Sequence, residues 1–123
     1  MDFELTGEQG AIFDMARDFA AEKLAPHALE WDQNKTFPLA TIREVAALGM
    51  AGIYVKEEHG GSELTRLDAT LVFEALAHGC PSIAAFISIH NMCTWMIDSF
   101  GSPEQRATGF QNCVRWKKSP AIA

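Results

Sequence analysis

Cysteine is scarce in this sequence, and the three residues present, Cys80, Cys93 and Cys113, are odd in number. Their separations match no disulfide framework, which argues against the small disulfide-stapled domains common among secreted proteins. We therefore expect the chain to work in a reducing compartment with its thiols free.

Positive charge and long apolar runs are also lacking. The formal net charge is −6, which argues against nucleic acid as a general partner. The longest unbroken apolar run, Ile83–Ile87, is far shorter than the roughly 20 residues of a transmembrane helix, so we expect no membrane span. The N-terminal sequence MDFELTGEQ is acidic and has no apolar h-region, so we expect neither a secretory signal nor a transit peptide.

What the sequence has instead is a long, nearly uncharged stretch, Gly79–Gly101, whose one charged residue is Asp98. Its apolar residues occupy more than one face at helical spacing, which is typical of a buried central helix. One stripe contains Ile83, Ile87, His90, Cys93 and Ile97. A second stripe contains Ala85, Ser88, Ile89, Met92 and Met96. Gly101 is predicted to stop the helix in the left-handed conformation.

Short polar motifs predict where other helices begin. Thr6–Gln9 and Ser102–Gln105 have the capping-box pattern, and Thr65–Asp68 pairs a hydroxyl with an acid at the same spacing. Residues 52–55 are predicted to form a brief extended run. Four or five helices with short links and no strand pairing predict an all-α fold, an antiparallel helical bundle.

Two short His–Cys motifs offer soft metal ligands: His78, Cys80, His90 and Cys93. Zinc would need such side chains in one tetrahedral set. The motifs lack CxxC or HExxH spacing, and free cysteine is common as a small core hydrophobe, so we predict core packing and no metal site.

The loop Lys56–Ser62 is the remaining polar motif. Its Gly-Gly pair would cradle a phosphate if it led into a helix N-terminus, but tight turns need glycine in any case. We predict a turn, with Glu57 and Glu58 on a solvated face. Composition and spacing alone therefore predict a helical domain and assign it no reaction.

Several motifs occur together in one order: FELTGEQ, LAPHALEWD, ALGMAGIYV, EEHGGSELTRLD and FGSPEQR. From Phe3 to Arg106 the chain resembles the N-terminal helical domain of the acyl-CoA dehydrogenases. Within that family, the run from Glu74 to Asp98 is most similar to members that act on short branched acyl-CoA substrates in valine breakdown.

The resemblance implies a homo-oligomeric FAD enzyme of the bacterial cytoplasm or the mitochondrial matrix. Such an enzyme oxidises acyl-CoA to trans-2-enoyl-CoA and passes electrons to electron-transferring flavoprotein. By alignment with the family, four positions of the second stripe would form a wall of the acyl pocket: Ala85, Ser88, Ile89 and Met92. The family's catalytic carboxylate lies in another domain, so we assign no catalytic role to four acids of this chain: Glu57, Glu58, Glu63 and Glu74.

The resemblance ends after Arg106, where the charge changes sign. Residues 1–110 carry seven of the ten Lys and Arg and all sixteen Asp and Glu, whereas residues 111–123 carry only basic charges. We expect residues 1–110 to form the domain and 111–123 to be an atypical tail, from a shifted reading frame or a chimeric end. The truncated chain alone should then bind no FAD and show no turnover. The alternative is a stand-alone helical binding or scaffolding module without catalysis.

Overall fold

The computed structural model describes residues 2–107 and places six α-helices and no β-strand in that range. The α-helices are α1 (Gly7–Phe19), α2 (Ala28–Asn34), α3 (Leu39–Ala47), α4 (Arg66–Ala77), α5 (Pro81–Phe100) and α6 (Pro103–Gln105). The predicted all-α fold is confirmed. None of the helices described is long and apolar enough to cross a membrane. The tail predicted at 111–123 lies outside the described residues.

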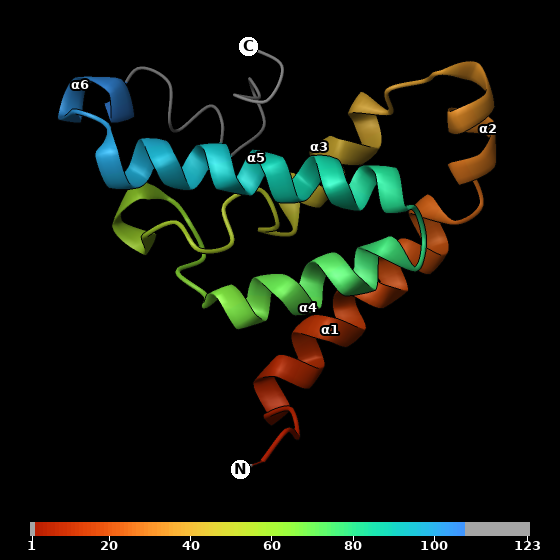
Figure 1. Cartoon of the computed structure of the whole chain (residues 1–123), viewed down its shortest axis with the longest axis horizontal. Helices are drawn as coiled ribbons and strands as arrows, with labels where there is room; N and C mark the ends of the chain where they lie inside the picture. Colours follow the sequence, from red (N-terminus) through yellow and green to blue (C-terminus); the bar gives the residue numbers. More distant parts are fainter. Residues whose placement is uncertain (1, 108–123) are drawn as a thin grey trace.

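The central element is α5, as the sequence predicted. It crosses the molecule with α4 antiparallel to it, and α1 packs on the other side of α4 (Figure 1). The turn between α4 and α5 approaches the first helix so closely that a Cβ on Gly79 would lie 2.5 Å from the Ala20 carbonyl oxygen. Glycine is therefore required where the three helices meet. The core that these three helices share with α3 includes Ala16, Leu24, Ile42, Val72, Leu76, Ile83 and Ile87.

The three predicted helix starts are confirmed. At each one, a hydroxyl oxygen accepts the backbone N–H of the residue three positions later, and the partner side chain accepts the N–H of the cap residue. These capping boxes lie at Thr6–Gln9, Thr65–Asp68 and Ser102–Gln105. The Gln9 side-chain amide also donates to Asp68 Oδ1 at 3.2 Å, so two caps join α1 to α4.

The first helix changes from an α-helical to a π-helical hydrogen-bond pattern before Pro26. It continues from α1 into a π-helical turn, Ala20–Leu24, in which Ala25 N–H donates to the Ala20 carbonyl oxygen at 2.9 Å. Helical periodicity predicted the helix but not this wider turn. The chain then turns at Pro26 and resumes as α2.

Two predictions of backbone conformation were wrong. Residues 52–55 form turns rather than an extended run, because the Ile53 N–H is taken by a side chain of α5. Gly101 has φ −70° and is extended, because the chain passes directly into the cap of α6. Glycine is needed at 101 for space, since a Cβ there would lie 2.4 Å from the Ile97 carbonyl oxygen.

Candidate functional site

The four predicted wall residues share one open face of α5. Ile89 and Met92 are 49% and 46% exposed, and Ala85 is exposed beside them. The half-buried Ser88 hydroxyl donates to the Ala85 carbonyl oxygen at 2.7 Å, so its hydrogen is used within the helix. The outward face is therefore mainly hydrocarbon, and nothing among the described residues encloses it.

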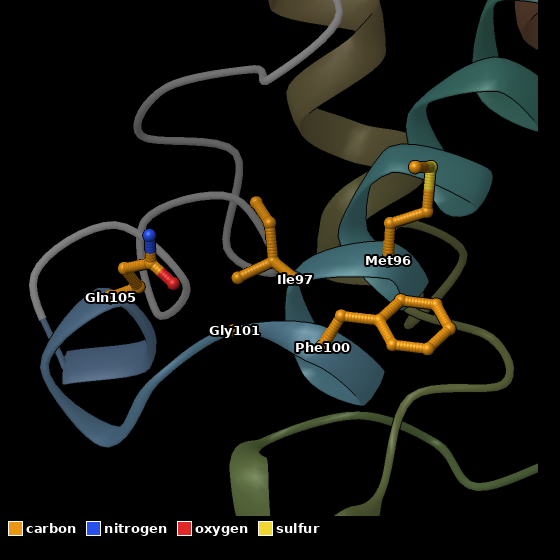
Figure 2. Close-up of a pocket in the computed structure, with 5 residues that line it drawn as sticks. All are labelled: Met96, Ile97, Phe100, Gly101 and Gln105. Carbon is orange, nitrogen blue, oxygen red and sulfur yellow. The ribbon is translucent and has the colours of Figure 1, made fainter.

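The exposed apolar face continues past the predicted wall to the end of α5. Met96 is 48% exposed and Phe100 is 76% exposed. An open hollow of about 390 Å³ lies beside them, between the end of α5 and α6 (Figure 2). Its lining residues are Met96, Ile97, Phe100, Gly101 and Gln105. The predicted stripe stopped at Met96, although Phe100 follows it by one helical turn.

The opposite face of α5 is buried and becomes polar in its second half. Four polar side chains there are at most 3% exposed: His90, Asn91, Thr94 and Asp98. Burial of α5 is therefore one-sided, because this face is covered while the face that carries Ile89 and Met92 is open. Polar groups can be buried here because each buried side-chain nitrogen and oxygen in the described range has a hydrogen-bond partner.

Asn91 ties α5 to the segment that follows α3. Its Oδ1 accepts the Ile53 N–H at 2.8 Å. Its Nδ2 donates to the carbonyl oxygens of Met50 and Ile87, each at 2.9 Å. The side chain thus uses both donor hydrogens and its acceptor while fully buried. In the sequence this residue only interrupts an apolar run, and no local pattern predicts its role.

Asp98 makes a second tie, two turns further along α5. One carboxylate oxygen accepts the Lys56 N–H at 3.3 Å, and the other contacts Nδ1 of His59. The other ring nitrogen of His59 lies 3.7 Å from the Glu58 carboxylate. We use the name polar seam for the two α5 side chains and the backbone groups that they bond: Asn91, Asp98, Met50, Ile53 and Lys56.

An arginine stacked between two aromatic rings lies beside the seam. The guanidinium carbon of Arg66 is 4.5 Å from the ring centroids of both Tyr54 and Trp95. The Trp95 ring in turn meets the Phe100 ring edge-on, with centroids 5.7 Å apart. Burial raises the pKa of Tyr54, and the positive charge of Arg66 opposes that rise. The stack links the start of α4 to the end of α5.

The predicted core packing of the His–Cys motifs holds for Cys80 and His90, which are buried; Cys93 is half-buried, and the prediction was wrong for His78, which is exposed. Within residues 2–107, no three His, Cys, Asp or Glu side chains are grouped to hold a metal ion. Cys80 and Cys93 are free thiols, whereas Cys113 lies outside the described range. The backbone N–H groups of Gly60–Ser62 donate to carbonyl oxygens of residues 52–57, so they form a turn and do not point at an anion. The acids left without a catalytic role are exposed: Glu57, Glu58, Glu63 and Glu74.

Comparison with known proteins identifies the family to which this chain belongs. Residues 6–115 match the family model of the acyl-CoA dehydrogenase N-terminal domain. The chain therefore belongs to the acyl-CoA dehydrogenase family, as the sequence motifs predicted.

Individual members of the family are similar to this chain in sequence and in structure. The mitochondrial isobutyryl-CoA dehydrogenase of Bos taurus is 53% identical over 102 residues, which are 83% of this chain and 24% of that protein. Butyryl-CoA dehydrogenase from Megasphaera elsdenii superposes with a TM-score of 0.87 at 32% identity, over 97% of this chain and 32% of that one. PigA with FAD and proline superposes with a TM-score of 0.87 at 32% identity, over 95% and 31%. The chain spans about a quarter to a third of the length of these proteins.

Proposed function

We propose that this chain is the N-terminal part of an FAD-dependent enzyme that oxidises short branched acyl-CoA to enoyl-CoA. In this proposal the exposed face of α5 forms one wall of the acyl pocket through Ala85, Ser88, Ile89 and Met92. The observation that carries it is the open hydrocarbon face of α5 in a chain of this family. Similarity to an isobutyryl-CoA dehydrogenase supports the choice of substrate class.

The dimensions and chemistry of the face fit a short acyl group. Seven residues separate Ala85 from Met92, which is about 10 Å along a helix. A hydrocarbon chain laid against this face would leave water at a gain of about 0.8 kcal/mol per buried methylene. Because the Ser88 hydroxyl hydrogen is already bonded to the helix, the wall offers no donor that would favour a polar substituent.

The glycine turn at residues 56–62 does not fit the phosphates of a flavin. The N–H groups of Gly60–Ser62 in this turn already donate to backbone carbonyl oxygens, and the loop carries the acids Glu57 and Glu58. We therefore assign FAD, and the carboxylate that would remove the α-proton, to parts of the enzyme outside residues 2–107. A relative described with FAD supports the cofactor assignment.

Partners and location follow from the same proposal. The full enzyme would be a homo-oligomer that gives its electrons to electron-transferring flavoprotein. Its place would be the mitochondrial matrix or the bacterial cytoplasm, and relatives of both origins support this pair of alternatives. The domain would extend to about residue 110. The rival function is a stand-alone helical binding or scaffolding module, which would keep α5 covered and need no acyl-CoA.

A chimeric enzyme tests the proposal. Residues 6–107 would replace the matching segment of Bos taurus isobutyryl-CoA dehydrogenase, and turnover of isobutyryl-CoA would be followed with an artificial electron acceptor. We expect an active chimera in which Ile89→Trp and Met92→Trp raise KM more than about tenfold by filling the pocket. Leu67→Trp, at a 57% exposed apolar position on α4, is the matched control and should leave KM unchanged. An inactive chimera, or wall variants that behave like the control, would contradict the proposal.

A further inference from the structure

We propose that Asn91 is a positioning residue for acyl selectivity, because its hydrogen bonds fix the rotation of α5 about its own axis. This inference rests on the proposed function of the exposed face. Asn91 does not touch that face itself. It acts by holding the helix against the backbone of Met50 and Ile53.

Helical geometry couples the polar seam to the wall. At about 100° per residue, Asn91 and Asp98 lie within roughly 20° of each other around α5, whereas Ile89 lies roughly 160° away. Ser88, Met92 and Ala85 lie roughly 60°, 100° and 120° from Asn91 on the same side as Ile89, so the seam and the wall occupy different sides of one rigid helix. Any rotation that the seam permits turns the wall by the same angle, and a binding site needs its side chains held to within about 10–20°.

Apolar packing alone would fix this angle less well. The first half of α5 is buried through Ile83, Ala84 and Ile87, and such contacts tolerate repacking when volume is conserved. Hydrogen bonds weaken steeply when their angle departs from linear, so those of Asn91 favour one setting. The backbone groups that Asn91 bonds are themselves held in the core, because Met50 and Ile53 are at most 2% exposed.

Thr94 provides a matched control on the same buried face. It is also fully buried and polar, but its hydroxyl donates at 2.7 Å to the carbonyl oxygen of His90, one turn back in the same helix. Removing that bond takes a buried polar group from α5 without releasing α5 from the rest of the domain. The contrast between Asn91 and Thr94 therefore separates positioning from general loss of stability.

The test compares Asn91→Leu, Asn91→Ser and Thr94→Val in the chimeric enzyme. Values of kcat and KM would be measured for isobutyryl-CoA and for straight-chain hexanoyl-CoA. We expect both Asn91 variants to change the ratio of kcat/KM between the two substrates by about tenfold, mainly through KM. Thr94→Val should leave the ratio unchanged.

A second measurement, on the chain itself, keeps the two proposals separate. Asn91→Ser should speed hydrogen exchange of the Ile53 amide by about tenfold or more relative to Thr94→Val. An inactive parent chimera together with this exchange response would overturn the proposed function, and with it the role in selectivity. If the chimera is active but the Asn91 variants leave the ratio of kcat/KM for the two substrates unchanged, only the role in selectivity is overturned. Unfolding of both Asn91 variants while Thr94→Val stays folded would also overturn it, since Asn91 would then act on stability only.

Discussion

The two faces of α5 reverse the arrangement expected of a surface helix. The outward face carries Ile89, Met92, Met96 and Phe100, each between 46% and 76% exposed. The inward face carries Asn91 and Asp98, each at most 3% exposed. Soluble monomers rarely expose so continuous an apolar strip to water. Such a strip is typical of a surface that another domain or chain covers.

The two faces of α5 have different roles. The inward face orients the helix, because its hydrogen bonds are directional and its partners are buried backbone groups. The outward face has no such partners and offers hydrocarbon to whatever lies against it. Substitutions on the two faces should therefore have unequal effects, and the largest should come from the inward face.

Breaking the inward face at Asn91 should cost the most. In Asn91→Leu, the Ile53 N–H and the Met50 carbonyl oxygen stay buried without this partner, and each such group costs about 1–3 kcal/mol. We expect the free energy of unfolding of the chain to fall by about 2–5 kcal/mol, measured by urea denaturation. A loss below about 0.5 kcal/mol, which is ordinary for surface changes, would show that the seam does not hold the helix.

The second tie should cost less. Asp98→Ala removes an acceptor from the Lys56 N–H and a contact from His59, both nearer the surface than the partners of Asn91. We expect a loss of about 1–3 kcal/mol in the same urea experiment. Asp98→Asn keeps an acceptor oxygen and should lose less. Equal losses in the two variants would assign the effect to the charge rather than to the hydrogen bond.

Changing the outward face should alter association more than stability. In the double variant Met96→Ser, Phe100→Ser, the change at Met96 should shift the free energy of unfolding by only about 0.5 kcal/mol, whereas the change at Phe100 also removes the edge-on contact with Trp95 and should lower it by about 0.5–1.5 kcal/mol. We expect the parent chain to self-associate through its apolar strip, and the variant to do so less, in sedimentation velocity. A parent chain that is monomeric at high concentration would favour the stand-alone module.

Asp68 on α4 gives a reference for a buried carboxylate outside α5. The Thr65 backbone N–H holds the pKa of this carboxyl below its ordinary value; burial opposes the shift, and the Thr65 hydroxyl and Gln9 amide add to it. The ionised group therefore stabilises the fold above about pH 4 and loses that contribution as the pH falls through its lowered native pKa. Asp68→Asn should cost about 1 kcal/mol at pH 7 and flatten the acid limb of a plot of stability against pH. An unchanged acid limb would show that this carboxylate contributes nothing to stability.

Much of the fold could be predicted from the sequence because its signals are local. The caps at Thr6–Gln9, Thr65–Asp68 and Ser102–Gln105 need only residues three apart, and the stripe from Ala85 to Met96 needs only the helical period. The role of that stripe as a wall of the acyl pocket came from the resemblance to the family and stays a prediction. The seam could not be predicted in this way, because the use of Asn91 depends on Met50 and Ile53, about 40 residues earlier. Periodicity also cannot say which of two apolar stripes faces inward. That choice depends on the tertiary partners of the polar residues between them.

Methionine oxidation tests the central claim most directly, because the chain carries its own internal standard. Met92 and Met96 lie on the outward face at 46% and 48% exposure, whereas Met50, whose carbonyl oxygen is part of the polar seam, is 2% exposed. Brief treatment of the folded chain with hydrogen peroxide, followed by peptide mass spectrometry, should oxidise Met92 and Met96 well before Met50. Oxidation of all three at one slow rate would mean that the outward face is already covered, and would contradict the division of α5 into an open and a buried face.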